Sequence, residues 1–161
     1  MLEGVFSDEH GDFPVGSYIR NPPTSQHTPG SKPGCTIFVK LWQFDPADRT
    51  HVRIETGKMP FLPAPDRPGV ELMPLFQDAR EHVRLERWAA GAGIILPLPG
   101  GIELLVLDGG FSESGETFEP QSWLRLPAGA TLKTKAGAMG CKLWVKTGHL
   151  AHAQTAPAAA A

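Results

Sequence analysis

The chain has 161 residues and a net charge of −2, and it contains no long run of basic or acidic residues. This balance excludes the electrostatic footprint of a protein that binds nucleic acid or an anionic membrane surface. No apolar run approaches the roughly 18 residues that a membrane-spanning helix needs, and the first residues do not resemble a signal peptide. We therefore expect a cytoplasmic protein whose two cysteines, Cys35 and Cys141, are free thiols.

The 18 glycines and 16 prolines favour many short strands joined by turns over long helices. In chain order, alternation and β-branched or aromatic residues predict strands over 17–20, 35–42, 51–55, 71–77, 83–88, 122–125 and 142–146, and the continuous apolar run 104–107 predicts another. Residues 59–69 hold four prolines and are the expected linker. The predicted organisation is a partial first repeat (1–58), the linker (59–69), a second barrel (70–150) and a disordered tail (151–161).

An internal repeat relates residues 2–40 to residues 107–146. Matched pairs include Gly4 with Gly109, Phe6 with Phe111, Phe13 with Phe118, Arg20 with Arg125 and Cys35 with Cys141. The equivalent cysteines favour a packing role over a mutual disulfide, and the equivalent arginines are candidates for structural ion pairs. Strand-like sequence over 70–106 precedes the second copy, whereas only Met1 precedes Leu2. We therefore expect the first copy to begin in the middle of its barrel.

One motif lies in residues 16–31: Gly16, five residues, Pro22-Pro23-Thr24, two residues, His27, three residues and Ser31. It resembles the second cupin motif, in which a glycine and an asparagine stand where this chain has Thr24 and Ser31. A proline ends one strand there, because it cannot extend a ladder, and the next strand starts with a histidine aimed into the barrel.

Longer stretches, LEGVFSDEHGDFPVGSYIRNPP with GCTIFVKLWQF and SWLRLPAG with GCKLWVKTGHL, closely resemble the ChrR-type cupin-like domain. The resemblance implies an all-β fold, a cupin (double-stranded β-helix, or jelly-roll) barrel of the RmlC-like superfamily, in two repeats of which the first is truncated at its N-terminus. That domain is the sensory half of certain zinc anti-sigma factors, and it also occurs in stand-alone and tandem cupins.

The resemblance also implies where a metal ion would bind. In the family, His-x-His-x-Gly-Gly-Glu-Glu supplies three ligands and the second motif supplies a histidine. In the second copy these four positions hold Leu96, Leu98, Ile102 and Leu132, which favours a core repacked without a metal. The first copy retains only His27, so zinc, iron or manganese would bind there only with co-ligands supplied from elsewhere.

The remaining histidines are expected to be structural or solvated: His10 in a turn, and His149 in a capping or surface role. Neither a catalytic triad nor a phosphate-binding loop can be defended. Three functions remain open. The favoured one is a regulatory or small-ligand-binding module without its own sigma-binding domain. The others are a dioxygenase-like metalloenzyme whose first-motif ligands are missing from this chain, and a structural pseudo-cupin. A role other than catalysis is favoured, and unpaired strand edges predict a homodimer.

Overall fold

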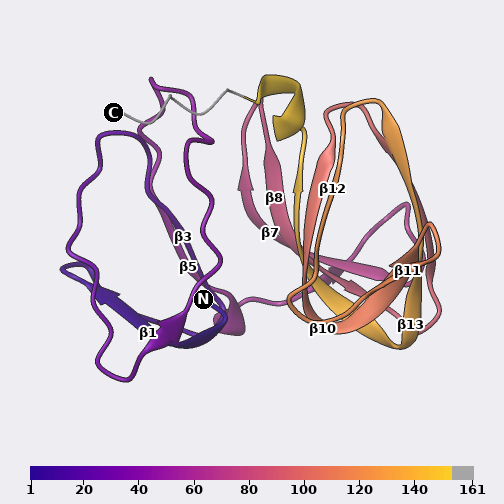
Figure 1. Cartoon of the computed structure of the whole chain (residues 1–161), viewed down its shortest axis with the longest axis horizontal. Coiled ribbons are helices and arrows are strands. Elements are labelled where there is room, and N and C mark those ends of the chain that lie inside the picture. Colours follow the sequence, from indigo (N-terminus) through magenta and orange to yellow (C-terminus); the bar gives the residue numbers. More distant parts are fainter. Residues whose placement is uncertain (154–161) are drawn as a thin grey trace. The chain divides into compact units, whose positions relative to one another are not determined.

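The computed structural model describes residues 1–153, which form β-strands joined by turns and loops, with two short 3-10 helices. The described chain contains two compact units, unit 1 (Met1–Met59) and unit 2 (Pro60–Ala153) (Figure 1). Every strand pairing in both units is antiparallel. The structure therefore confirms the all-β class expected from the glycine and proline content. Neither of the helices described over residues 1–153 has the length and apolar character needed to cross a membrane.

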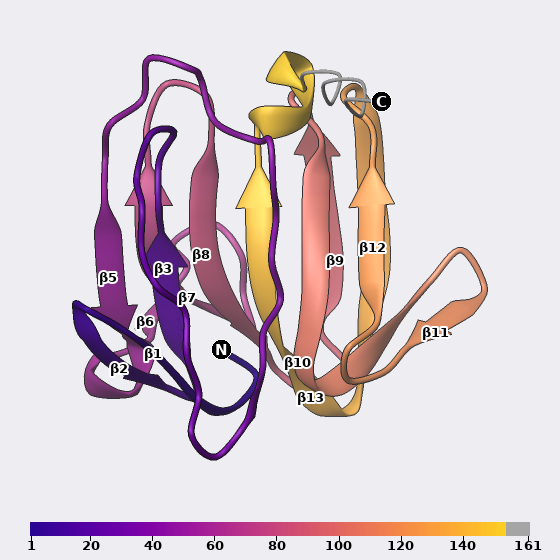
Figure 2. The ribbon, with the colours of Figure 1, turned by 60° about the vertical axis from the view of Figure 1, so that its left-hand side comes forward.

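Unit 1 is built from short strands separated by long loops (Figures 1 and 2). Its elements are β1 (Glu3–Asp8), β2 (Gly11–Pro14), β3 (Ser17–Arg20), β4 (Cys35–Thr36), β5 (Val52–Glu55) and η1 (Thr56–Lys58). Strand β1 lies between β2 and β4 in a three-stranded sheet, and β3 pairs with β5. Few side chains of unit 1 are buried, because its strands are too short to form an extensive core.

Unit 2 forms a larger antiparallel structure around β10 and β13, which run side by side (Figure 1). Its elements are β6 (Leu62–Pro63), β7 (Val70–Gln77), β8 (His82–Trp88), β9 (Gly93–Leu98), β10 (Ile102–Glu113), β11 (Glu116–Phe118), β12 (Trp123–Leu126), β13 (Ala130–Thr147) and η2 (His149–His152). Strand β13 has 18 residues and pairs with β8, β9 and β10.

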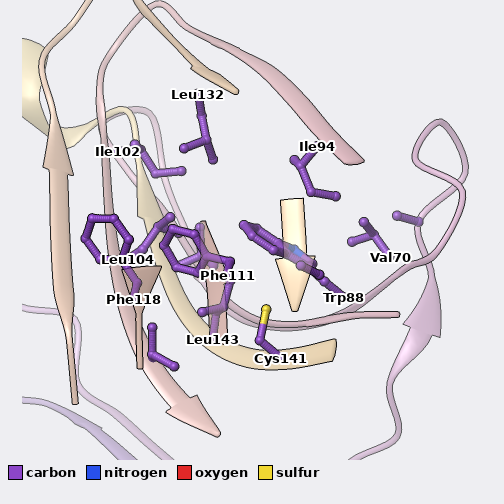
Figure 3. Packing of buried hydrophobic residues seen from close by; sticks show 14 of the residues in the cluster. Val70, Trp88, Ile94, Ile102, Leu104, Phe111, Phe118, Leu132, Cys141 and Leu143 are labelled. Atoms are coloured by element: carbon purple, nitrogen blue, oxygen red, sulfur yellow. The ribbon is translucent and has the colours of Figure 1, made fainter. Parts of the chain in front are cut away.

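The interior of unit 2 is a single apolar cluster (Figure 3). Its aromatic members include Trp88, Phe111 and Phe118, and the rings of Phe111 and Phe118 stack with 4.7 Å between their centroids. Alternate residues of β10 and β13 point into this cluster, as the two-residue period of a strand requires. Burial of these apolar side chains is the main stabilising contribution to unit 2.

The structure confirms the internal repeat, because the two copies share their strand register. Phe6 pairs with Phe13 as Phe111 pairs with Phe118. Gly4 pairs with Cys35 as Gly109 pairs with Cys141. Gly4 and Gly109 adopt φ angles of 68° and 65°, and a Cβ atom at either position would overlap a backbone carbonyl oxygen of the facing strand. Only glycine fits this crossing, which explains its presence in both copies.

Met1 occupies the position in copy one that Val106 occupies in copy two. The Met1 amino group donates to the Ser17 carbonyl at 2.9 Å, and the Val106 N–H donates to the Ser122 carbonyl at 3.0 Å. In return, the Met1 carbonyl accepts from Gly16 and the Val106 carbonyl accepts from Gln121. The repeat therefore holds to the first residue of the chain.

The strand expected over residues 35–42 is wrong beyond Thr36. Strand β4 pairs with β1 only at Cys35 and Thr36, where it reaches the start of β1. In unit 2 the matching part of β13 continues its pairing along residues 102–106 of β10. Residues 37–42 have no neighbouring strand among the described residues, and Trp42 is 69% exposed.

The proline-rich segment 59–69 differs from the linker expected there, because most of it packs within unit 2. Strand β6 pairs with β7, Ala64 is buried in the apolar cluster, and Arg67 forms an ion pair with Glu86. Of the expected disordered tail 151–161, the first two residues belong to η2, and residues 154–161 lie outside the described part of the chain.

Candidate functional site

The four positions at which the sequence resemblance implies metal ligands lie inside unit 2. Leu98, Ile102 and Leu132 belong to the apolar cluster and are fully buried, and Leu96 packs against it. Leu96 and Leu132 are direct cross-strand neighbours on β9 and β13. Figure 3 shows Ile102 and Leu132 pointing into the cluster. Aliphatic side chains offer no lone pair to a cation, so these residues do not fit a bound metal ion.

His27 lies in unit 1, in the loop between β3 and β4, and its side chain is exposed. Its Nδ1 atom is 3.3 Å from Nδ2 of Asn21, and its ring meets the ring of Phe6 edge-on at 6.0 Å between centroids. The exposure of His27 differs from the orientation into the barrel that its motif predicts. Its role as a metal ligand stays a prediction.

A charged cluster on the inner face of unit 2 was not foreseen from the sequence. Glu86 accepts hydrogen bonds from both guanidinium nitrogens of Arg67, at 2.9 and 3.0 Å. Arg84 donates through Nε at 2.6 Å, and the indole N–H of Trp88 donates at 2.6 Å. We call Arg67, Arg84 and Glu86 the interior ion cluster. All its donors converge on a single carboxylate.

The strand register places the interior ion cluster against the apolar core. Glu86 faces Leu143, and Arg84 faces Val145, across the β8–β13 pairing. Both leucine and valine belong to the buried apolar cluster. Burial alone would raise the pKa of Glu86, but the charges of Arg84 and Arg67 and the hydrogen bonds they and Trp88 donate outweigh it and hold that pKa below its usual value. Glu86 is therefore ionised at neutral pH.

Burial affects Cys141 in the opposite direction. Desolvation, assisted by the negative charge of Glu86, raises the pKa of the Cys141 thiol to about 12. At neutral pH the thiol is protonated, and it is a poor nucleophile and metal ligand. This agrees with the packing role that the repeat predicted for it.

A sequence signal for the interior ion cluster did exist. Arg84, Glu86 and Trp88 alternate along one predicted strand, and residues two apart share a face. Because a buried tryptophan marks the inner face, the arginine and the glutamate had to lie there too. Arg67 could not be found in this way, because it lies in the segment interpreted as a linker.

The two repeated arginines form ion pairs, as the sequence suggested, but with different partners. Arg20 pairs with Asp48, and Arg125 lies 3.8 Å from Glu103. Glu103 also accepts a contact of 2.9 Å from Nε2 of His149, which is mostly buried rather than on the surface. These pairs connect neighbouring elements, and we assign them structural roles.

Comparison with known proteins places the chain in a family. The model of the ChrR Cupin-like domain matches residues 1–45 and 49–151. The chain belongs to the ChrR cupin-like family. The match covers both units and agrees with the all-β fold described above.

Solved structures show that this ChrR-type chain has a cupin fold. A candidate dioxygenase from Nostoc punctiforme aligns with 97% of this chain and 64% of its own, at 13% identity and a TM-score of 0.69. An RmlC-like cupin from Ralstonia eutropha aligns with 58% of this chain and 65% of its own, at 15% identity and a TM-score of 0.52. The complex of SigE with the anti-sigma ChrR from Rhodobacter sphaeroides aligns with 56% of this chain and 49% of its own, at 17% identity and a TM-score of 0.50.

This ChrR-type chain thus spans between about half and just under two thirds of the length of those solved chains. No curated protein matches it. At these identities the comparisons establish the fold, and the activity has to be argued from the site.

Proposed function

We propose that this protein is a regulatory cupin module that binds a small ligand and works without a metal ion in its second barrel. The observation that carries the proposal is the filling of the four implied ligand positions by Leu96, Leu98, Ile102 and Leu132 within one apolar core. A dioxygenase-like enzyme needs a metal with open coordination positions, and unit 2 offers no donor at those places.

The interior ion cluster suggests the chemical class of the ligand. Two guanidinium groups face one carboxylate, which leaves a net charge of about +1 at neutral pH. The side chain of Arg67 is 20% exposed, whereas Glu86 is almost completely buried. Guanidinium groups bind carboxylates in a planar, bidentate geometry. Both terminal nitrogens of Arg67 already donate to Glu86, so we propose that a small organic carboxylate binds to the remaining N–H groups of this guanidinium.

Partner binding belongs to the same proposal. The ChrR structure to which this chain is similar contains a sigma factor, SigE. For this chain we propose a homodimer, in which the exposed apolar residues of segment 37–42 supply contact area. Ile37, Val39 and Leu41 are exposed there beside Trp42.

Isothermal titration of the full chain with a panel of small mono- and dicarboxylates, beside the matching neutral amides, tests the ligand. We expect binding of a carboxylate and not of its amide, and loss of binding in Arg67→Gln. Arg87→Gln is the matched control, because Arg87 lies next to Glu86 on the opposite face of β8 and pairs with Glu71 at 3.9 Å. Absence of binding across the panel, or equal binding by Arg67→Gln, contradicts the proposal.

A further inference from the structure

The turn between β1 and β2 brings together three side chains with metal-binding atoms. Asp8, Glu9 and His10 each offer one ligand atom, and the three atoms lie within 4.8 Å of one another. Glu9 and His10 are exposed, so an ion could reach them from solvent. This group lies in unit 1, and none of its three residues is a position at which the family resemblance implies a metal ligand.

Asp8 supplies an independent observation that points to a ligand. Its side chain is 0% exposed, although Asp8 is the last residue of β1, next to the hairpin turn. Oδ1 accepts from the His10 N–H at 2.7 Å and lies 3.3 Å from Nδ1 of the imidazole. Oδ2 is buried and has no hydrogen-bond partner. A buried carboxylate oxygen without a donor is costly, and a bound cation is one way to compensate its charge.

Glu9 is held in place by a contact from a distant part of unit 1. The Thr28 N–H donates to its Oε2 at 2.8 Å. The Thr28 hydrogen bond therefore holds the Glu9 carboxylate near the imidazole of His10.

We propose that the β1–β2 turn of unit 1 binds one divalent transition-metal ion through Asp8, Glu9 and His10. Two carboxylates and one imidazole form a donor set that suits Zn²⁺ or Mn²⁺. Three protein ligands leave positions for water, so the site is an open surface site. The ion compensates the buried Asp8 oxygen and fixes the turn against the 27–28 segment.

The second copy of the repeat provides an internal control. The β10–β11 turn has the same register, with Glu113 in the place of Asp8. There Ser114 and Gly115 replace the glutamate and the histidine, and the Ser114 hydroxyl donates to Glu113 at 2.8 Å. This turn therefore has a carboxylate without an imidazole, and it should bind no ion.

Isothermal titration of the full apo-chain with ZnCl₂ alone, and separately with MnCl₂ alone, tests the site. We expect the chain to bind one equivalent of at least one of the two metal ions. The affinity for that ion should be at least about tenfold lower in His10→Ala and in Asp8→Asn. Glu113→Gln should bind like the unaltered chain. NMR of the imidazole nitrogens should show a shift of the His10 signals on addition of Zn²⁺, which a purely structural turn would not produce.

Three results overturn this site. They are no binding of either ion, binding that His10→Ala leaves unchanged, and binding that His27→Ala abolishes while His10→Ala does not. The last result would instead favour a site centred on His27. Because the ligand test uses Arg67 in unit 2, failure of one proposal can be told from failure of the other.

Discussion

Replacing Leu132 by histidine would put back the residue that the second cupin motif implies at this position. The leucine is fully buried, so its removal from the apolar core costs about 1.5–3 kcal/mol. The buried imidazole gains no partner among the surrounding aliphatic side chains, which adds about 1–3 kcal/mol. We therefore expect Leu132→His to lower the free energy of unfolding of unit 2 by about 3–6 kcal/mol, a large share of the 5–15 kcal/mol typical of a domain.

Urea unfolding of the full chain at pH 7.5, followed by circular dichroism with and without Zn²⁺, measures this loss. Leu132→Met is the matched control, because it conserves volume and should cost less than about 1.5 kcal/mol. A loss below about 1 kcal/mol for the histidine variant would refute the reasoning. So would full recovery of stability on addition of the metal, since both results would mean that the interior has room and donors for an ion.

Three further outcomes are expected. Gly109→Ala should destabilise unit 2 by roughly 2 kcal/mol or more in the same urea experiment, because its Cβ would overlap a backbone carbonyl. Gly115→Ala is the control, because the space around Gly115 is open. It should cost only the strain of the left-handed backbone conformation, about 1–2 kcal/mol. The pKa of Glu86 is below its ordinary value of 4.5, so the stability it contributes is present above that pH and is lost as the pH falls below it. Glu86→Gln should therefore lower the free energy of unfolding by about 3–5 kcal/mol at pH 7, because it leaves Arg84 unpaired. The stability of this variant should also depend less on pH between about pH 5 and pH 3. A pH dependence equal to that of the unaltered chain would contradict this. Sedimentation velocity over a wide concentration range should show a dimer that Trp42→Ser weakens, and a monomer at all concentrations would argue against the homodimer.

Much of the fold could be predicted because the sequence contains its motif twice. One such glycine, taken alone, would not identify a structural feature. The recurrence of Gly4 as Gly109, each with an equivalent Gly-Cys pair, indicates that both copies contain the same close approach of two backbones. The strand signal in β8 and the continuous apolar run 104–107 in β10 depend only on local sequence. Family membership then supplied the positions of Leu96 and Leu132 in the barrel.

The failures involve information that is not local. Segment 37–42 has a strong strand pattern, yet a strand needs a neighbour, and pairing is decided elsewhere in the chain. The prolines of segment 59–69 indicated a linker, whereas an edge strand such as β6 tolerates proline. The approach of Arg67 to Glu86 spans 19 residues and could not be read from either segment alone.

The shared register of the two copies places one thiol in each at the same crossing. Cys35 is exposed, whereas Cys141 is buried and has a pKa raised to about 12. An alkylating reagent should therefore modify Cys35 in the folded protein and reach Cys141 only when unit 2 opens. The duplicated cysteine thus gives each unit its own chemical reporter. A dye on Cys35 reports on conformational changes of unit 1, and the labelling rate of Cys141 reports how often unit 2 opens.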